Sequence, residues 1–177
     1  DYHVDSISGQ WDYVEPVLFG YAAGIVIKSY VENFCTSAEK VVAHFHEWMT
    51  ASGGLYLRKH SPYVATVFTT HATVAGRCIA GNGLSLYSDL HKFNADDLAR
   101  RFNVTAKHSI EKMAALYHDA FLTVSDITAN ECKYLLGREV TNITPNGFEN
   151  DFVWKADEFE AKRKEARAAM INVAEVC

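Results

Sequence analysis

Four groups of polar residues, each placed just after an apolar run, contain the side chains that group-transfer chemistry uses. The groups are His46-Glu47-Trp48, the segment from His71 to Arg77, Ser125-Asp126 and Asn146-Gly147. Imidazole and carboxylate groups accept, donate or orient protons, and a guanidinium group binds phosphate oxygens through paired hydrogen bonds. Polar residues in one or two loops would be unremarkable. The convergence of imidazole, carboxylate, guanidinium and amide groups is what indicates a site.

The apolar runs before these groups have the composition of β-strands. Strands are predicted at 40–46, 63–70, 120–125 and 140–144, and the first two have the pattern of strands buried on both faces. Apolar residues at three- and four-residue steps predict helices between them. These helices cover 14–34, 49–60, 96–119, 127–136 and 155–177, with Gly76 to Gly83 as a Gly-rich stretch and Gly137 as a C-cap.

This alternation of strands and helices predicts an α/β fold with a doubly wound, mostly parallel sheet. Right-handed crossovers bring the carboxyl ends of all parallel strands to one edge, where open α/β sheets bind ligands. The four polar groups are therefore expected at that edge. Residues 1–150 are expected to form this domain, and residues 151–177 are expected to form a helical segment that packs on another part of the protein.

Composition narrows the partners that we expect. The chain has 177 residues and a formal net charge of −5, which argues against an electrostatic grip on nucleic acid or an anionic membrane. The longest apolar stretch, Val17 to Ile27, is interrupted by Gly20 and Gly24, so no membrane span is expected. The four cysteines are far apart, and we interpret them as free thiols of a cytoplasmic protein.

Four strings resemble the animal and fungal glycogen synthase family. They are Val-Ala-His-Phe-His-Glu-Trp at 42–48, Phe-Thr-Thr-His-Ala-Thr-Val-Ala-Gly-Arg at 68–77, Phe-Leu-Thr-Val-Ser-Asp-Ile-Thr-Ala at 121–129 and Thr-Pro-Asn-Gly at 144–147. They stand in the family's order at nearly its spacings, over roughly residues 15 to 150. The resemblance implies an incomplete, Rossmann-like N-terminal half of a GT-B glycosyltransferase of family 3.

The resemblance also implies an activity for the whole protein. The family transfers glucose from a nucleotide sugar, usually UDP-glucose, to the 4-hydroxyl of an α-1,4-glucan such as glycogen, with retention at the anomeric carbon. It implies no metal or other cofactor. The chain lacks the family's N-terminal Gly-rich loop and the basic residues of its C-terminal domain, so it is expected to be an inactive fragment. We also expect a sheet face or edge left open to favour a homo-oligomer.

Roles for single residues follow from the matched strings. The donor side is then formed by His71, Arg77, Asn146 and Gly147, and the acceptor side by His46, Glu47 and Trp48, with His71 and Glu47 as the catalytic residues. Such a transfer must stabilise an oxocarbenium-like carbon and a departing diphosphate together. Arg77 suits the phosphate oxygens, and an indole such as Trp48 can stack on a sugar ring.

Two other interpretations stay open from the residues alone. The chain can be a non-catalytic carbohydrate-binding or assembly module that keeps a relict site. Alternatively, His44 and His46 share one strand face and can form a metal pair with His71, as in a metallohydrolase. Trp48 can equally serve core or domain-interface packing.

Overall fold

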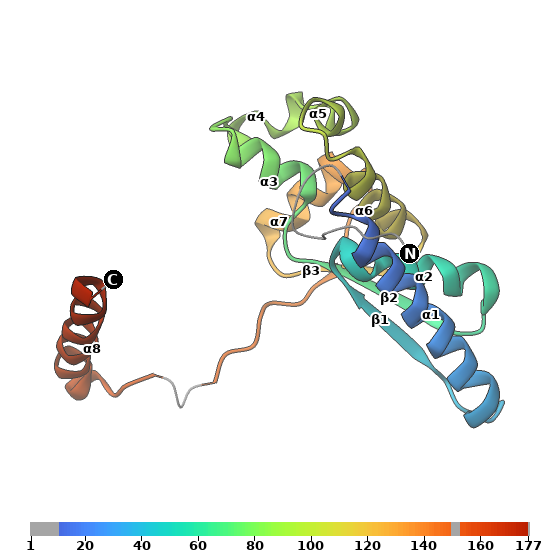
Figure 1. Ribbon diagram of the computed structural model, residues 1–177, viewed down its shortest axis with the longest axis horizontal. Helices are drawn as coiled ribbons and strands as arrows, with labels where there is room; N and C mark the ends of the chain where they lie inside the picture. The colour runs from blue at the N-terminus through green and yellow to red at the C-terminus, as the bar shows by residue number, and fades with distance from the viewer. Residues whose placement is uncertain (1–10, 150–152, 177) are drawn as a thin grey trace. The chain divides into compact units, whose positions relative to one another are not determined.

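The computed structural model describes residues 11–149 and 153–176. The strands are β1 (Val42–His46), β2 (Ala65–Thr70), β3 (Ala120–Thr123) and β4 (Asn142–Ile143). The helices, drawn in Figure 1, are α1 (Val14–Phe34), α2 (Glu47–His60), α3 (Val74–Gly81), α4 (Leu86–Asp89), α5 (Ala95–Arg101), α6 (Thr105–Tyr117), α7 (Asp126–Glu131) and α8 (Ala156–Val176), with a 3-10 turn η1 (Leu90–Lys92) and a π-helix η2 (Cys132–Leu136). The chain divides into two compact units, Asp1–Pro145 and Asn146–Cys177, and α8 belongs to the second.

The sheet is parallel and its strand order follows the chain. The order is β1-β2-β3-β4, and every pair of neighbours is parallel. Phe45 lies beside Phe68 in the register, and Phe68 lies beside Phe121. The α/β class and the parallel sheet predicted from the sequence are confirmed, and the carboxyl ends of the strands share one edge.

One face of the sheet is covered by helices and the other is open. Along β1, Ala43 and Phe45 are buried while Val42, His44 and His46 are exposed. The prediction that this strand is buried on both faces is therefore wrong for the described part of the chain. Right-handed crossovers between strands in chain order place every connecting helix on the same side, because no step reverses direction. Figure 1 shows α1, α2 and α6 on one side of the sheet.

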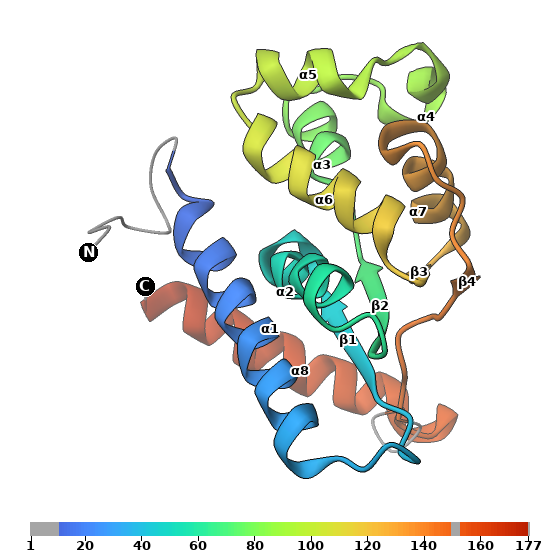
Figure 2. The same ribbon diagram turned by 90° about the vertical axis from the view of Figure 1, so that its right-hand side faces the viewer.

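The main core lies between the covered sheet face and helices α2 and α6. Phe68 and Phe121 stack with ring centroids 5.7 Å apart, and Leu57 of α2 and Ala114 of α6 close over them. A second apolar cluster joins α3, α4 and α5 to Leu135 of η2. In Figure 2 these helices form a group beyond the carboxyl end of β2. This group fixes the loop that leaves β2.

Three glycines let α1 and α2 pack closely. A β-carbon at Gly24 would stand 2.8 Å from the carbonyl oxygen of Gly53, and one at Gly53 would stand 2.4 Å from that of Gly20. Both distances are shorter than real β-carbon contacts, so backbone touches backbone at this crossing. The hydroxyl of Ser52 donates to the carbonyl oxygen of Val17 across the same contact, at 2.7 Å. The start of α2 is thereby anchored to α1.

Helix α1 is also the one described helix that is long and apolar enough to cross a membrane. It has 21 residues, and its most apolar window has a mean hydropathy of 1.3. The sequence interpretation took Gly20 and Gly24 as interruptions, but both lie inside this helix and face α2. Length and composition alone do not separate a span from a core helix. The absence of a membrane partner stays a prediction.

Several element boundaries differ from those predicted. The Gly-rich stretch is mostly helix α3, and the helix predicted over 96–119 is two helices, α5 and α6. The chain breaks between them at Asn103, whose φ of 56° is left-handed, a conformation that asparagine tolerates better than most residues. Gly137 closes η2 with a φ of 77°, so its predicted role as a C-cap is confirmed.

Candidate functional site

The turn from β1 into α2 reaches across to the loop after β2. His46 is the last residue of β1, and Glu47 begins α2 with a φ of 62°, which costs about 1 kcal/mol or more for a residue with a side chain. Oε1 of Glu47 accepts a hydrogen bond from the backbone N–H of His71 at 2.9 Å. The left-handed backbone therefore coincides with a link between two of the predicted site residues.

Three histidine rings lie in a row at this edge of the open sheet face. The ring centroids of His44 and His46 are 4.2 Å apart, and those of His46 and His71 are 5.9 Å apart. Nε2 of His44 is 2.8 Å from Oγ1 of Thr69 on β2. Burial, and then the neighbouring His46, hold the pKa of His44 below its ordinary value. The structure thus brings His46, Glu47 and His71 together, as the sequence predicts.

The metal-site alternative finds no support in this arrangement. Within residues 11–149 and 153–176, no group of three or more His, Cys, Asp or Glu side chains has the geometry to hold a metal ion. His44 instead bonds to the hydroxyl of Thr69. A catalytic zinc site needs three protein ligands that converge on one point.

The segment after His71 is fixed by side chains from distant parts of the chain. Thr73 caps α3, because its Oγ1 accepts from the N–H of Gly76 at 2.9 Å. The same hydroxyl donates to Oε2 of Glu131 at 3.0 Å, and Oε2 of Glu111 accepts from the N–H of Val74 at 2.9 Å. The loop and the first turn of α3 are therefore tied to α6 and α7.

Arg77 stands one turn into α3 on an exposed part of that helix. Its guanidinium group makes neither an ion pair nor a hydrogen bond with the described residues. A guanidinium group in this state is available for an anionic ligand. No hydrogen bond joins Arg77 to His71, and the two are connected through the fixed segment between them.

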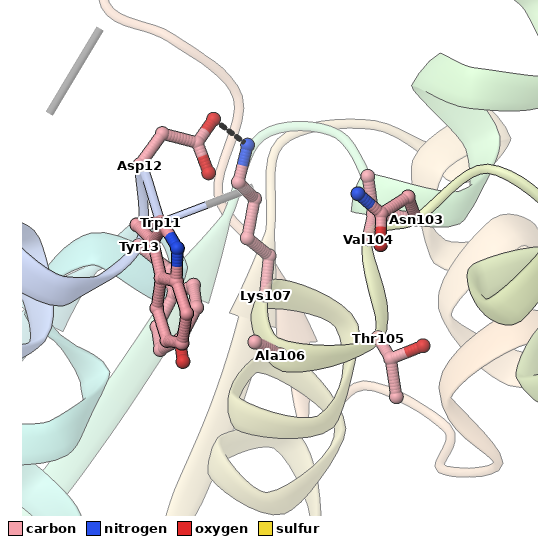
Figure 3. Close-up of a pocket in the computed structure, with 8 residues that line it drawn as sticks. All are labelled: Trp11, Asp12, Tyr13, Asn103, Val104, Thr105, Ala106 and Lys107. Carbon is pink, nitrogen blue, oxygen red and sulfur yellow. Dashed lines mark hydrogen bonds and ion pairs between the residues drawn. The ribbon is translucent and has the colours of Figure 1, made fainter. Parts of the chain in front are cut away.

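Trp48 is half-buried and already has a partner. The ammonium group of Lys107 lies 5.7 Å from the centre of its ring, within range of a cation–π contact. Lys107 also pairs with Asp12, as Figure 3 shows, and both residues line a pocket of about 240 Å³. The pocket is lined by Trp11, Asp12, Tyr13, Asn103, Val104, Thr105, Ala106 and Lys107, and it contains none of the predicted site residues.

The third and fourth polar groups are not joined to the others by any described contact. Ser125 caps α7 by accepting from the N–H of Thr128 at 3.2 Å, which is a structural task. Asn146 and Gly147 follow β4, are exposed and belong to the second compact unit. Their place on the donor side stays a prediction.

Sequence reasoning missed two buried glutamates next to the site. Glu111 is fully buried and Glu131 is 4% exposed. Burial is the main cause that raises the pKa of Glu111 to about 8. The nearby Glu47 and Glu131 act in the same direction, and the hydrogen bonds of Glu111 act against it. A signal was present, because Glu111 stands three and four residues before Ala114 and Ala115, on the apolar face of α6.

Comparison with known proteins agrees with this architecture. The family model described as glycogen synthase matches residues 4–172. A glycogen [starch] synthase of Dictyostelium discoideum is 37% identical over 146 residues, which are 82% of this chain and 16% of that protein. The Caenorhabditis elegans protein of that name is 35% identical over 75% of this chain and 20% of its own length, and isoform 2 of Saccharomyces cerevisiae is 42% identical over 63% and 16%.

The chain thus spans about a fifth or less of the length of these curated relatives. The match nevertheless extends over almost all of this chain. It covers the β1–α2 turn, the loop after β2 and the start of α3. The family resemblance noted from four short strings is confirmed over this range. The chain belongs to the glycogen synthase family.

Proposed function

We propose that this chain is part of a retaining glycosyltransferase that transfers glucose from UDP-glucose to the 4-hydroxyl of an α-1,4-glucan such as glycogen, without a metal cofactor. The observation that carries the proposal is the hydrogen bond from the His71 N–H to Glu47 at the carboxyl edge of a parallel sheet, in a chain of this family. That edge is where open α/β sheets bind ligands. The nucleotide sugar and the glucan are the expected partners.

On the donor side, His71 lines the transferred glucose and Arg77 receives the departing diphosphate. A carbon that becomes oxocarbenium-like needs electron-rich neighbours, and the carbonyl and ring of His71 supply them. Charge develops on the phosphate oxygens at the same time, and the exposed guanidinium of Arg77 can bind two of them. Asn146 and Gly147 complete this side in the proposal, near the transferred sugar.

On the acceptor side, one carboxylate oxygen of Glu47 accepts a hydrogen bond, and the other has no hydrogen-bond partner among the described residues. Its Oε1 holds the N–H of His71, so Oε2 is available to orient a sugar hydroxyl. His46 stands next to it with an exposed side chain, and Trp48 offers part of its ring. For a sugar to stack on Trp48, it must share or displace the contact with Lys107.

The test uses the natural gene product that carries this chain, after mass spectrometry has established its length. We expect His71→Ala to lower kcat for transfer of labelled glucose from UDP-glucose to glycogen by about 100-fold, because one preorganised group at the reacting carbon is lost. His91→Ala, at an exposed histidine of η1, is the matched control and should retain activity. Transfer that is equally fast in both variants would refute the role of His71.

The 177-residue chain by itself should transfer no glucose, because it spans only a fraction of its relatives. Turnover by this chain alone would contradict that expectation. If the natural protein binds glycogen but transfers nothing, the binding-module alternative replaces the transferase. We place the protein in the cytoplasm, and the free thiols of Cys35, Cys78 and Cys132 support a reducing compartment.

We also propose that the chain forms a homo-oligomer through its open sheet face. Val42 of β1 is 61% exposed on that face, and the partly buried Val67 of β2 and Leu122 of β3 lie on the same face. Val42→Lys places a charge on this surface without touching the core. Light scattering should show an average mass above 19.8 kDa for the wild type and a lower mass for this variant. A monodisperse monomer at high concentration would exclude the oligomer.

A further inference from the structure

Three glutamates from three different helices hold one short loop. Glu47 at the start of α2 accepts from the N–H of His71, Glu111 of α6 accepts from the N–H of Val74, and Glu131 of α7 accepts from the hydroxyl of Thr73. Glu131 also accepts from the phenol of Tyr87 at 3.2 Å. The His71–Val74 loop therefore has few degrees of freedom left, although it runs at the surface edge of the sheet.

The hydroxyl of Thr70 adds a further attachment to this loop, and that attachment depends on the protonation of Glu111. Oγ1 of Thr70 lies 3.1 Å from Oε1 of Glu111 and 3.1 Å from the carbonyl oxygen of Ala72. A hydroxyl has one proton and can donate to only one of these two acceptors. When Glu111 is protonated, it donates to Thr70, and Thr70 donates to Ala72. When Glu111 is ionised, its carboxylate accepts the hydrogen bond from Thr70, and the Ala72 carbonyl loses its donor.

The surroundings of Glu111 favour the protonated form. It is fully buried, and the titratable groups that face it are Glu47 of α2, Glu131 of α7 and Cys132 of η2. None of these is a cation. Burial raises the pKa of Glu111 to about 8, so near neutral pH the acid is mostly neutral and the donor chain to Ala72 is complete.

We propose that Glu111, acting through Thr70, is a positioning residue that holds the His71–Val74 loop in the geometry needed for glucose transfer. The proposal rests on the proposed function, since His71 is the residue that it positions. Glu131 supports the same loop from the other side through Thr73. Loss of the Glu111 proton then loosens the loop next to His71 without changing any group that touches the sugar.

The sharpest variant removes only the relay hydroxyl. Thr70→Val has nearly the shape of threonine and cannot donate to Ala72, whereas Thr70→Ser keeps the hydroxyl and is the matched control. In the natural gene product, Thr70→Val should lower kcat about tenfold with little change in KM for UDP-glucose or glycogen. Thr70→Ser should retain most of the wild-type kcat. Equal kcat values for the two variants would overturn the relay.

The pH profile provides a second readout that a purely structural role would not move. The wild-type kcat should decline as the pH rises past about 8, where Glu111 ionises. In Glu111→Gln the amide donates to Thr70 at every pH, while its oxygen accepts from Val74, so the decline should disappear. A decline that persists unchanged in Glu111→Gln would refute the proposal, even if Thr70→Val fails to fold.

Hydrogen exchange separates this proposal from the proposed function, because it needs no turnover. In the 177-residue chain, Thr70→Val should speed exchange of the His71 and Val74 amides about tenfold, and Thr70→Ser should not. Faster exchange in a protein that transfers no glucose would refute the transferase and keep the loop relay. Unchanged exchange in Thr70→Val, with normal transfer, would refute the relay alone.

Discussion

The wild-type chain is expected to lose about 5 kcal/mol of its free energy of unfolding as the pH rises from 4.5 to above 8, and Glu111→Gln is expected not to show this loss. The folded state raises the pKa of Glu111 from 4.5 to about 8, so between these values the folded chain binds a proton that the unfolded chain has released. Stability is therefore complete below pH 4.5 and decreases until Glu111 ionises in the folded state. Glutamine has no proton to release.

The measurement is urea unfolding of the 177-residue chain between pH 6.5 and 8.5. This window avoids the titration of His118. Burial lowers the pKa of His118 to about 4, so the stability that His118 contributes is lost as the pH falls from 6.5 to 4, below the window. Within the window the wild type should lose about 2 kcal/mol of its free energy of unfolding, and Glu111→Gln should lose little. Glu175→Gln, at an exposed position of α8, is the control and should follow the wild type.

Parallel curves for the wild type and Glu111→Gln would show that Glu111 titrates normally. They would also remove the chemical basis for a neutral acid beneath the His71–Val74 loop. A free energy of unfolding of the wild type that increases with pH would lead to the same conclusion about Glu111.

Gly54→Ala should destabilise the chain by about 3 kcal/mol or more. A β-carbon at Gly54 would stand 1.8 Å from Nε2 of His118, far inside van der Waals contact. The ring cannot retreat easily, because Nδ1 of His118 is 2.9 Å from the carbonyl oxygen of Ala114 and its faces are packed near Phe45 and Phe68. His118 is itself only 2% exposed.

Gly81→Ala is the matched control for this substitution. Gly81 ends α3, has no positive φ, and a β-carbon there meets nothing within 4 Å. Alanine should therefore be neutral or stabilise by about 0.5–1 kcal/mol through helix propensity. Thermal unfolding of both variants tests the pair. A midpoint for Gly54→Ala equal to that of the wild type would mean that α2 does not pack on His118 as the structure shows.

The sequence predicted those features of the fold that depend on residues close together in the chain. β-branched and aromatic runs predicted all four strands, and alternation with helices predicted that they are parallel. The parallel arrangement in turn predicted that His46, Glu47 and His71 lie at one edge of the sheet, although it predicted no particular contact between them. The capping role of Gly137 was likewise local, because glycine adopts a positive φ without strain.

Features that depend on distant parts of the chain were not predicted. The exposure of His44 and Val42 follows from a strand order that never reverses, which no single strand encodes. The position of Glu111 on the apolar face of α6 signals burial, but its hydrogen-bond partners Thr70 and Val74 come from a distant part of the chain. The left-handed φ of Glu47 coincides with its hydrogen bond to His71, 24 residues further on.

The glycine contact between α1 and α2 restricts which substitutions this sequence can accept during evolution. Gly20 and Gly53 face each other so closely that neither can gain a β-carbon while the helices keep their separation. A lineage that replaced one of them would have to move α1 and α2 apart, and any shift of α2 would also move the turn that carries Glu47. Homologues with alanine at either position should therefore show a wider crossing and compensating changes near the β1–α2 turn, far from the substituted residue.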